Sequence, residues 1–241
     1  MNPRAASREQ SRALDVAAER SGVPPSMLMG VAGFQVGRLA SNLLRDGSAP
    51  RGRVGVIAGR GSNGGDGLVA ARHLAAWGSV VRCLVLTSAR DSAASGPGLA
   101  RSAGAAGAEV RMVEAGDPAI QASADWVLED VDLIVDSLLG TGAAGAPRGE
   151  VATLIRRINR SSAVVLAVDL PSGLDADSGI AEGDCVRAHH TLMLGAPRLG
   201  CEQLGARHWV GRLWMADIGI PRSCYLECGL EPPPGLGPDP A

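Results

Sequence analysis

The order of apolar and polar positions divides the chain into two helical segments followed by an alternation of strands and helices. Within residues 9–20 the apolar Leu14, Ala17 and Ala18 fall on one helical face, opposite charged residues. A glycine and a proline follow and end this helix. A second helix is predicted over residues 25–44, where small and apolar side chains recur at helical spacing.

Downstream of these helices, short apolar runs alternate with helical patterns and turn residues. Strands are predicted at residues 53–58, 80–86, 109–113, 133–136 and 163–168, with shorter ones near 185–186, 190–194 and 212–216. Helices are predicted at 67–77, 97–104, 118–128 and 150–159. Strands that alternate with helices favour a mostly parallel sheet covered on both faces, and such strands are near-continuous apolar runs. The pattern predicts a three-layer α/β/α sandwich.

This alternation forms one domain in our interpretation, over about residues 9–222. Residues 1–8 are expected to be a flexible tail. Residues 223–241 are expected to be a second flexible tail, because residues 231–240 are rich in proline.

Composition narrows the function classes. A net charge of −2 and only 2% aromatic residues give no case for nucleic-acid or anionic-membrane binding. All basic residues are arginine, which excludes a Schiff-base or Walker-type lysine. The five scattered cysteines are not typical of a disulfide framework or a zinc site, and the polar first ten residues have no apolar core of a signal peptide. We expect a cytoplasmic protein without a membrane span.

A glycine-rich stretch between the first strand and the next helix offers the first candidate chemistry. Residues 59–67 contain five glycines, and a strand, a glycine turn and a helix N-terminus together favour phosphate binding. The spacing of Gly59, Gly61 and Gly64 also fits a dinucleotide fingerprint, but the next strand ends without the acid that would hold a ribose. Asp66 has two readings that remain open: it caps the helix N-terminus, or it belongs to the site.

Two further strands end in loops with polar side chains. Asp136 follows the strand at 133–136, and Asp169 and Ser172 follow the strand at 163–168. Ligands of open α/β sheets bind at the carboxyl ends of the strands, so these groups should meet near Asn63. Oxygen ligands from Asn63, Asp136 and Ser172 suit a hard cation, and a single carboxylate among neutral oxygens fits a monovalent ion.

At these residues the sequence resembles the YjeF N-terminal domain family, the NAD(P)H-hydrate epimerases. The family pattern at the first loop is Gly-x-Gly-Asn-Asn-Gly-Gly-Asp-Gly, which stands here at residues 59–67. The second is Val-Asp followed by Gly-Thr-Gly, at residues 135–136 and 140–142. The third is Val-Asp-x-Pro-Ser-Gly-x-Asp, at residues 168–175. Three spaced motifs in order are more specific than a glycine fingerprint alone.

The resemblance implies a Rossmann-like fold, often dimeric, that interconverts the R and S forms of hydrated NADH or NADPH. A separate ATP- or ADP-dependent dehydratase then acts on the S form, so a dehydratase is the implied functional partner and a homodimer one expected state. A potassium ion is implied at Asn63, Asp136 and Ser172. The residues that the resemblance implies for substrate binding are Ser62, Asn63, Gly64, Gly65, Asp66, Gly140, Thr141, Gly142, Ala143, Ala144, Gly145, Ala146 and Asp169.

Inversion at the hydrated carbon requires its C–O bond to break and form again, through ring opening or an iminium. Both routes need a proton delivered or removed, and Asp169 is the residue that we assign as general acid/base. The chain departs from the family pattern at Ser62, at Gly30 and Val31, at Ala143 and Ala144, and at Arg198, where a lysine is common. These departures motivate an alternative hypothesis, a catalytically weakened nucleotide-binding or dimerisation scaffold.

Overall fold

A computed structural model describes residues 4–46, 52–88, 96–114 and 116–233. Its strands are β1 (Arg53–Ala58), β2 (Val80–Thr87), β3 (Glu109–Glu114), β4 (Leu133–Ser137), β5 (Val164–Val168), β6 (His190–Leu194) and β7 (Arg212–Ala216). Its helices are α1 (Arg8–Arg20), α2 (Pro25–Asp46), α3 (Ser62–Ala76), α4 (Gly96–Ala105), α5 (Ile120–Leu128), α6 (Gly149–Ile158), α7 (Arg207–Val210) and α8 (Arg222–Glu227). Two 3₁₀ turns, Gly200–Glu202 and Leu204–Ala206, precede α7.

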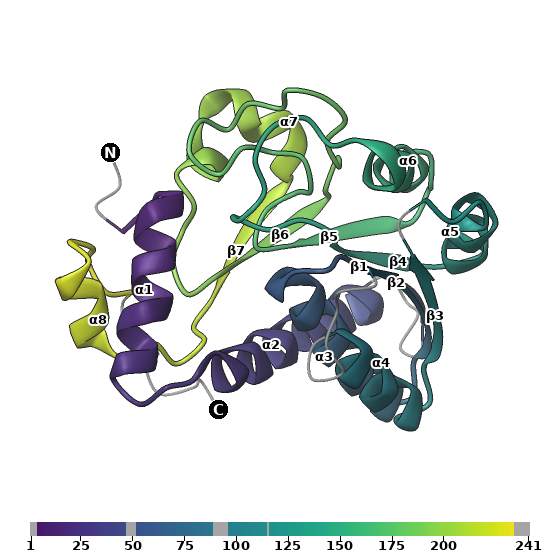
Figure 1. The fold of residues 1–241 in the computed structure, drawn as a ribbon, viewed down its shortest axis with the longest axis horizontal. Helices are drawn as coiled ribbons and strands as arrows, with labels where there is room; N and C mark the ends of the chain where they lie inside the picture. The colour runs from purple at the N-terminus through teal and green to yellow at the C-terminus, as the bar shows by residue number, and fades with distance from the viewer. Residues whose placement is uncertain (1–3, 47–51, 89–95, 115, 234–241) are drawn as a thin grey trace.

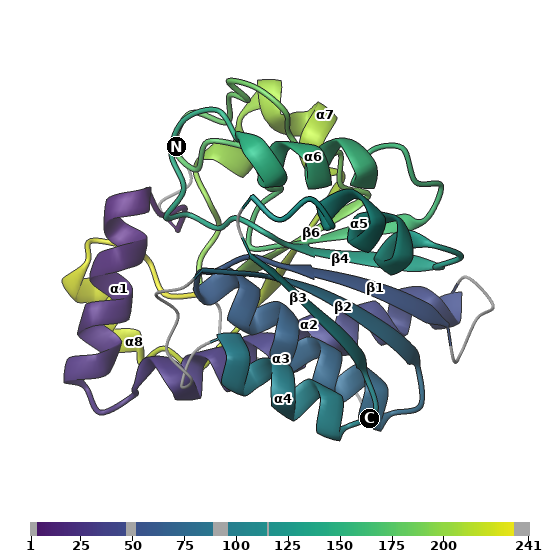
Figure 2. The same cartoon turned by 45° about the vertical axis from the view of Figure 1, so that its right-hand side comes forward.

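The seven strands form one sheet of order β3-β2-β1-β4-β5-β6-β7, and every neighbouring pair is parallel. Helices α2, α3 and α4 cover one face of the sheet, and α5, α6 and α7 cover the other (Figure 1, Figure 2). Helices α1 and α8 lie side by side at one end of the molecule. The predicted α/β/α architecture and its parallel sheet are confirmed.

The core consists of apolar clusters on the two faces of the sheet. Along β1, Val54, Val56 and Ala58 join the cluster under α2 and α3, whereas Ile57 joins the cluster under α5 and α6. This division follows the period of two along a strand, which sends successive side chains to opposite faces. Valine, leucine, isoleucine and alanine fill both clusters, in keeping with the scarcity of aromatic residues.

Most predicted elements lie within a few residues of the observed ones, and two predictions are wrong. Residues 185–186 form no strand. Helix α3 begins at Ser62 rather than at residue 67, so most of the predicted glycine loop is helical. The physical reason is close packing: a Cβ at Gly59 would lie 1.8 Å from the Leu138 carbonyl oxygen, and one at Gly64 would lie 1.9 Å from the Gly59 carbonyl oxygen. Glycine is therefore required here for close approach and not for a loop.

The expected tails differ from the structure where it describes them. Ala5 and Ala6 are buried, and the Ala6 N–H donates to the Pro197 carbonyl oxygen at 2.8 Å. All of helix α8 except its first residue lies in the segment predicted to be a tail, and the helix buries Tyr225 against the core. Apolar side chains in both segments explain the difference, because they gain from burial against the sheet end. Residues 1–3 and 234–241 lie outside the described residues.

None of the helices in the described ranges has both the length and the apolar character needed to cross a bilayer.

Candidate active site

A cavity lies beside the predicted residues, at the carboxyl ends of the central strands. The strand order reverses between β1 and β4, which is where open α/β sheets bind ligands. The cavity, of about 520 Å³, opens there, and it is lined by the loops after β1, β4, β5 and β6 together with α1 and α2. The fold therefore brings the three predicted motifs to one crevice.

The N-terminus of α3 forms one wall of this cavity. Gly61 is the N-cap, in an extended conformation and without a side-chain cap, and Ser62 and Asn63 occupy the first turn at the cavity wall. The N–H groups of a first helical turn have no partner within the helix, so this wall favours an anion. Asp66 lies one turn inside the helix, so the reading of Asp66 as the N-cap is wrong.

Beside the cavity, the buried residues Asn63, Asp136 and Ser172 are connected into one oxygen cluster, in which Leu139 bonds both Asn63 and Ser172. Ser172 donates its hydroxyl to Asp136 Oδ1 at 2.6 Å and its N–H to Oδ2 at 2.9 Å. The Asn63 amide nitrogen donates to the Leu139 carbonyl oxygen at 2.8 Å, whereas its Oδ1 is buried and has no partner among the described residues. Because Asp136 is completely buried, desolvation raises the pKa of its carboxyl to about 6, against the lowering effect of the Ser172 hydrogen bonds.

The chemistry of the oxygen cluster suits a cation. It combines one carboxylate, one unpartnered amide oxygen and one hydroxyl, and a positive charge would relieve the desolvation of Asp136. No group of three or more His, Cys, Asp or Glu able to hold a metal occurs in the described part of the chain. A monovalent ion, with its tolerance for neutral oxygens, fits this set better than a transition metal.

Asp169 stands at the end of β5 with its carboxylate held by Arg198. Its φ is +70°, a left-handed conformation that costs a non-glycine residue on the order of 1–3 kcal/mol, and such strain clusters at functional sites. The Asp169 Oδ1 accepts from Arg198 Nε at 2.9 Å and lies 2.8 Å from Arg198 Nη2. The Leu194 N–H also approaches Oδ1, at 3.3 Å. None of the described residues bonds Oδ2, so this oxygen is left to the cavity that Asp169 lines.

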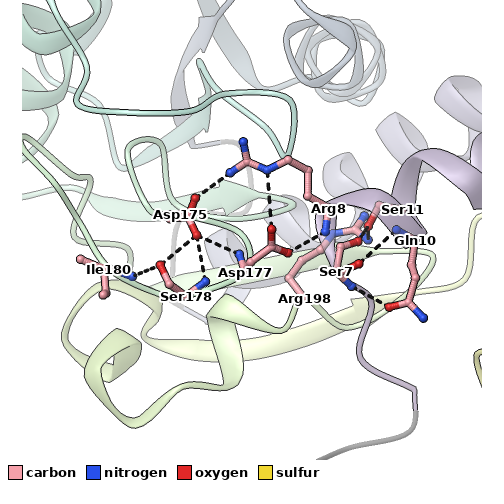
Figure 3. Close-up of polar contacts among 9 residues, drawn as sticks. All are labelled: Ser7, Arg8, Gln10, Ser11, Asp175, Asp177, Ser178, Ile180 and Arg198. Atoms are coloured by element: carbon pink, nitrogen blue, oxygen red, sulfur yellow. Dashed lines mark hydrogen bonds and ion pairs between the residues drawn. The ribbon is translucent and has the colours of Figure 1, made fainter.

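Arg198 is itself buried, and each of its three guanidinium nitrogens donates a hydrogen bond. Its Nη1 donates to the Ser11 hydroxyl at 2.7 Å, and its Nη2 donates to the Leu194 carbonyl oxygen at 2.8 Å. Figure 3 shows the contact between Arg198 and Ser11, which belongs to α1. The first helix therefore positions the guanidinium that holds Asp169. This chain of contacts places the ion pair Asp169–Arg198 at one end of the cavity.

Two more carboxyl groups line the same cavity. Asp66 on α3 is buried, and its pKa is raised well above the usual range by desolvation first and then by the charges of Asp169 and Asp15. Asp15 on α1 also has a raised pKa, chiefly through desolvation, which the charge of Arg198 partly offsets. Three carboxyl groups thus share a space whose buried cation is Arg198.

The second glycine loop is only partly in the main cavity. The cavity lining includes Gly140, Thr141, Gly142 and Ala143. Ala144 and Gly145 line a small neighbouring pocket, and Ala146 packs near Gly183.

The glycines of the first loop divide in the same way. Gly65 lines a second cavity, of about 510 Å³, beside α2 and α4, and Gly64 packs against Gly59. Ser62, Asn63, Asp66 and Asp169 are brought to the main cavity as predicted.

The residues missed from the sequence come from α1 and from the loop after β6. From the sequence, Asp15 is one of the charged residues opposite the apolar face of this helix, Ser11 has no predicted role, and Arg198 is noted only for its difference from the family pattern. The N-terminus of α1 is fixed against the loop after β5, because Arg8 donates to Asp175 at 2.7 Å and pairs with Asp177 (Figure 3). The periodicity of α1 predicts which of its faces is buried, but it does not predict which residues that face contacts.

Comparison with known proteins assigns the chain to a family. The family model described as YjeF-related protein N-terminus matches residues 25–200. The chain therefore belongs to the family of YjeF-related N-terminal domains.

Curated relatives agree over almost the whole length. The chain is 36% identical over 206 residues to the NAD(P)H-hydrate epimerase of Rhodopirellula baltica. This alignment covers 86% of the chain and 80% of that protein. The chain is 38% identical over 227 residues to the NAD(P)H-hydrate epimerase of Pirellula staleyi, with 93% and 96% covered. It is 40% identical to the bifunctional NAD(P)H-hydrate repair enzyme Nnr of Pyrobaculum aerophilum, with 88% of this chain but 41% of that protein covered.

Among solved structures, the crystal structure of yeast ynu0 superposes with a TM-score of 0.81. The match covers 98% of this chain and 97% of the yeast chain at 21% identity. At that identity the likeness supports the fold alone.

Proposed function

We propose that this chain is an NAD(P)H-hydrate epimerase, an isomerase that interconverts the R and S forms of hydrated NADH and NADPH. The observation that carries the proposal is the cavity at the strand-order reversal, where the N-terminus of α3 faces the held carboxylate of Asp169. The names of relatives 36% and 38% identical over most of the chain support the same activity.

The two walls of the cavity suit the two kinds of group in such a substrate. The first turn of α3 offers unpaired N–H groups to a phosphate, and the exposed Arg60 at the same wall adds positive charge. The other wall carries Asp169, which can accept or donate a proton. The hydrated nicotinamide ring therefore belongs near Asp169, and the pyrophosphate near α3.

Asp169 acts as general acid/base on the carbon that carries the hydroxyl. Arg198 and the Leu194 N–H fix Oδ1, so that Oδ2 is oriented toward the cavity to exchange a proton with the leaving or entering oxygen. Orientation by packed neighbours is what a positioned general base requires.

The oxygen cluster would hold a potassium ion through Asn63 Oδ1, the Asp136 carboxylate and Ser172 Oγ. Bound there, the ion would supply positive charge that stabilises the loops after β1, β4 and β5. The donor set and the unpartnered amide oxygen support a monovalent cation, and the family resemblance makes potassium the ion that we propose.

The direct test supplies the R-hydrate of NADH to the full chain and follows its conversion to the S-hydrate by chiral chromatography, with and without potassium. Wild-type protein should catalyse the conversion and Asp169→Asn should not. Equal rates in the two proteins would remove Asp169 from catalysis, and no rate in wild type would reject the epimerase.

The alternative scaffold function has a separate outcome in this experiment. A scaffold that keeps a ligand pocket would show thermal stabilisation by NADP without epimerisation. A separate dehydratase that consumes the S-hydrate is part of the proposal, and the 41% coverage of a bifunctional relative leaves room there for a second activity. The homodimer and the cytoplasmic location expected from the sequence stay predictions.

A further inference from the structure

Three carboxyl groups meet in the main cavity, and their surroundings are unequal. The Asp169 Oδ1 accepts a hydrogen bond from Arg198 Nε. The Nη1 of Arg198 donates to the Ser11 hydroxyl, and its Nη2 donates to the Leu194 carbonyl oxygen. Arg198 makes no hydrogen bond to Asp15 or Asp66, although its charge partly offsets the raised pKa of Asp15. The other arginine of the cavity lining, Arg60, is exposed to solvent.

Asp66 is the carboxyl group without compensation. Its side chain is only 8% exposed, and among the described residues it makes no hydrogen bond and no ion pair. The α2 residues at this wall, Met29, Ala32 and Gly33, carry no charge that could pair with it. A buried carboxyl group in such a place avoids the cost of an unpaired charge by keeping its proton.

The titratable groups near Asp66 also raise its pKa. Burial, then the negative charges of Asp169 from β5 and Asp15 from α1, raise the pKa of Asp66 well above its usual range. Two carboxyl groups with opposite protonation states in one cavity are the arrangement that divides acid and base roles. Asp66 is the member with the raised pKa and no partner, and Asp169 is the member that a guanidinium holds.

We propose that Asp66 is a second catalytic residue, which donates a proton to the leaving hydroxyl while Asp169 accepts a proton from the entering water. The inference rests on the proposed epimerase function and deepens it. It assigns to Asp66 a chemical step, whereas the family resemblance implies only substrate binding for this residue.

The step balances as follows on the hydrated ring. The C–O bond breaks with its electron pair on oxygen, the Asp66 proton joins that oxygen, and water leaves while the nitrogen lone pair forms a C=N bond. Water then adds to the other face of the same carbon, the C=N electrons return to nitrogen, and the surplus proton goes to Asp169. Transfer of that proton from Asp169 to Asp66 through water restores both groups.

The experiment compares wild type with Asp66→Asn in the R-hydrate to S-hydrate assay across pH. Asparagine keeps the shape but has no acidic proton, so kcat is expected to fall at least about 100-fold, with KM little changed. Wild-type kcat should decline as pH rises through the raised pKa of Asp66, and the residual rate of Asp66→Asn should lack that decline. Asp66→Glu should recover part of the rate.

A second measurement is independent of turnover. The infrared carbonyl band of a protonated carboxyl group should be present at neutral pH in wild type and reduced in Asp66→Asn. The matched control is Asp125→Asn, an exposed aspartate paired with Arg157 away from the cavity, which should leave the rate, the pH profile and the band unchanged. Circular dichroism checks that each variant folds.

The outcomes separate the two proposals. Wild-type kcat and pH profile in Asp66→Asn would overturn the role of Asp66 and leave the epimerase intact. An unchanged infrared band in that variant would show that Asp66 is ionised, which also overturns the role. No conversion by wild type would overturn the epimerase, and this inference with it.

Discussion

Two clusters bury carboxyl groups in opposite ways. One is the oxygen cluster, and the other is an acid cluster of three residues that line the cavity, Asp15, Asp66 and Asp169. In the oxygen cluster, Asp136 receives the Ser172 hydroxyl and two backbone N–H groups, from Ser172 and Leu138, but no cationic side chain. In the acid cluster, Asp169 has a guanidinium and Asp66 has no partner among the described residues. A buried carboxylate that accepts hydrogen bonds suits the binding of a cation. A buried carboxyl group without partners has a raised pKa and suits proton transfer.

The comparison teaches that burial alone does not define a role. Asp66 and Asp136 are both buried, and desolvation raises the pKa of each. Their neighbours separate them: neutral donors surround Asp136, and the like charges of Asp169 and Asp15 face Asp66. The two clusters should therefore respond differently to substitution, to ions and to pH.

The largest effect is expected from the acid cluster. Asp169→Asn removes the proposed general acid/base and should lower the rate of the proposed epimerisation about 100- to 10,000-fold. Initial rates of R-hydrate conversion measure the loss, with Asp125→Asn as the exposed control. A loss of less than tenfold would assign Asp169 to binding alone.

A large effect on stability is expected from Arg198→Ala. The substitution leaves Asp169 buried without its guanidinium and should lower the free energy of unfolding by about 3 to 5 kcal/mol. Urea unfolding measures the change. Arg198→Lys keeps the charge but loses the Nη1 contact to Ser11. Its free energy of unfolding should lie between those of wild type and Arg198→Ala. A cost under 1 kcal/mol would mean that the pair contributes little to the fold.

The oxygen cluster should respond to potassium where the acid cluster does not. At a potassium concentration about 100 times its dissociation constant, binding should raise the free energy of unfolding by about 2.7 kcal/mol. The folded-state pKa of Asp136 is about 6, so protons compete with the ion and the stabilisation should fade as pH falls below that value. Asp136→Asn should abolish the effect and Asp66→Asn should keep it. Thermal unfolding in potassium against tetramethylammonium chloride at equal ionic strength measures it.

The smallest effect is expected where α1 is fixed beside the acid cluster. Arg8→Ala breaks the partly buried contact to Asp175 and should cost about 1 kcal/mol. Hydrogen bonds from Ser178 lower the pKa of Asp175 first, so this contribution is present near neutral pH and is lost as pH falls through that lowered value. Urea unfolding at pH 7 and at low pH compares the variant with wild type, and an equal deficit at both would contradict the assignment.

Much of the fold could be predicted from the sequence, because local pattern and global layers agree. Apolar runs such as residues 164–168 specify strands buried on both faces, and their order with helices specifies the parallel sheet. The start of α3 could not be predicted, since glycine propensity argues against a helix over residues 62–67. Close packing of Gly64 and Gly67 against backbone and Ser137 overrides that propensity.

The site could be predicted in its motifs and not in its partners. Asn63, Asp136, Asp169 and Ser172 follow strand ends, and the common edge of a parallel sheet brings them together. The contact of Ser11 with Arg198 joins residues 187 apart in sequence, and no local pattern reports such a contact. For the same reason the protonation state of Asp66 depends on neighbours that only the folded chain supplies.

The pairing of α1 with α8 has a consequence for how the cavity is made during synthesis. Gln10 donates to the Cys228 carbonyl oxygen and Arg20 pairs with Glu227, so the helix that carries Ser11 and Asp15 docks on the last helix of the fold. Among the described elements, α1 leaves the ribosome before any of its docking partners and α8 leaves it after all the others. The growing chain therefore holds an incomplete pocket until the loops after β5 and β6, and then α8, are available for α1 to dock on.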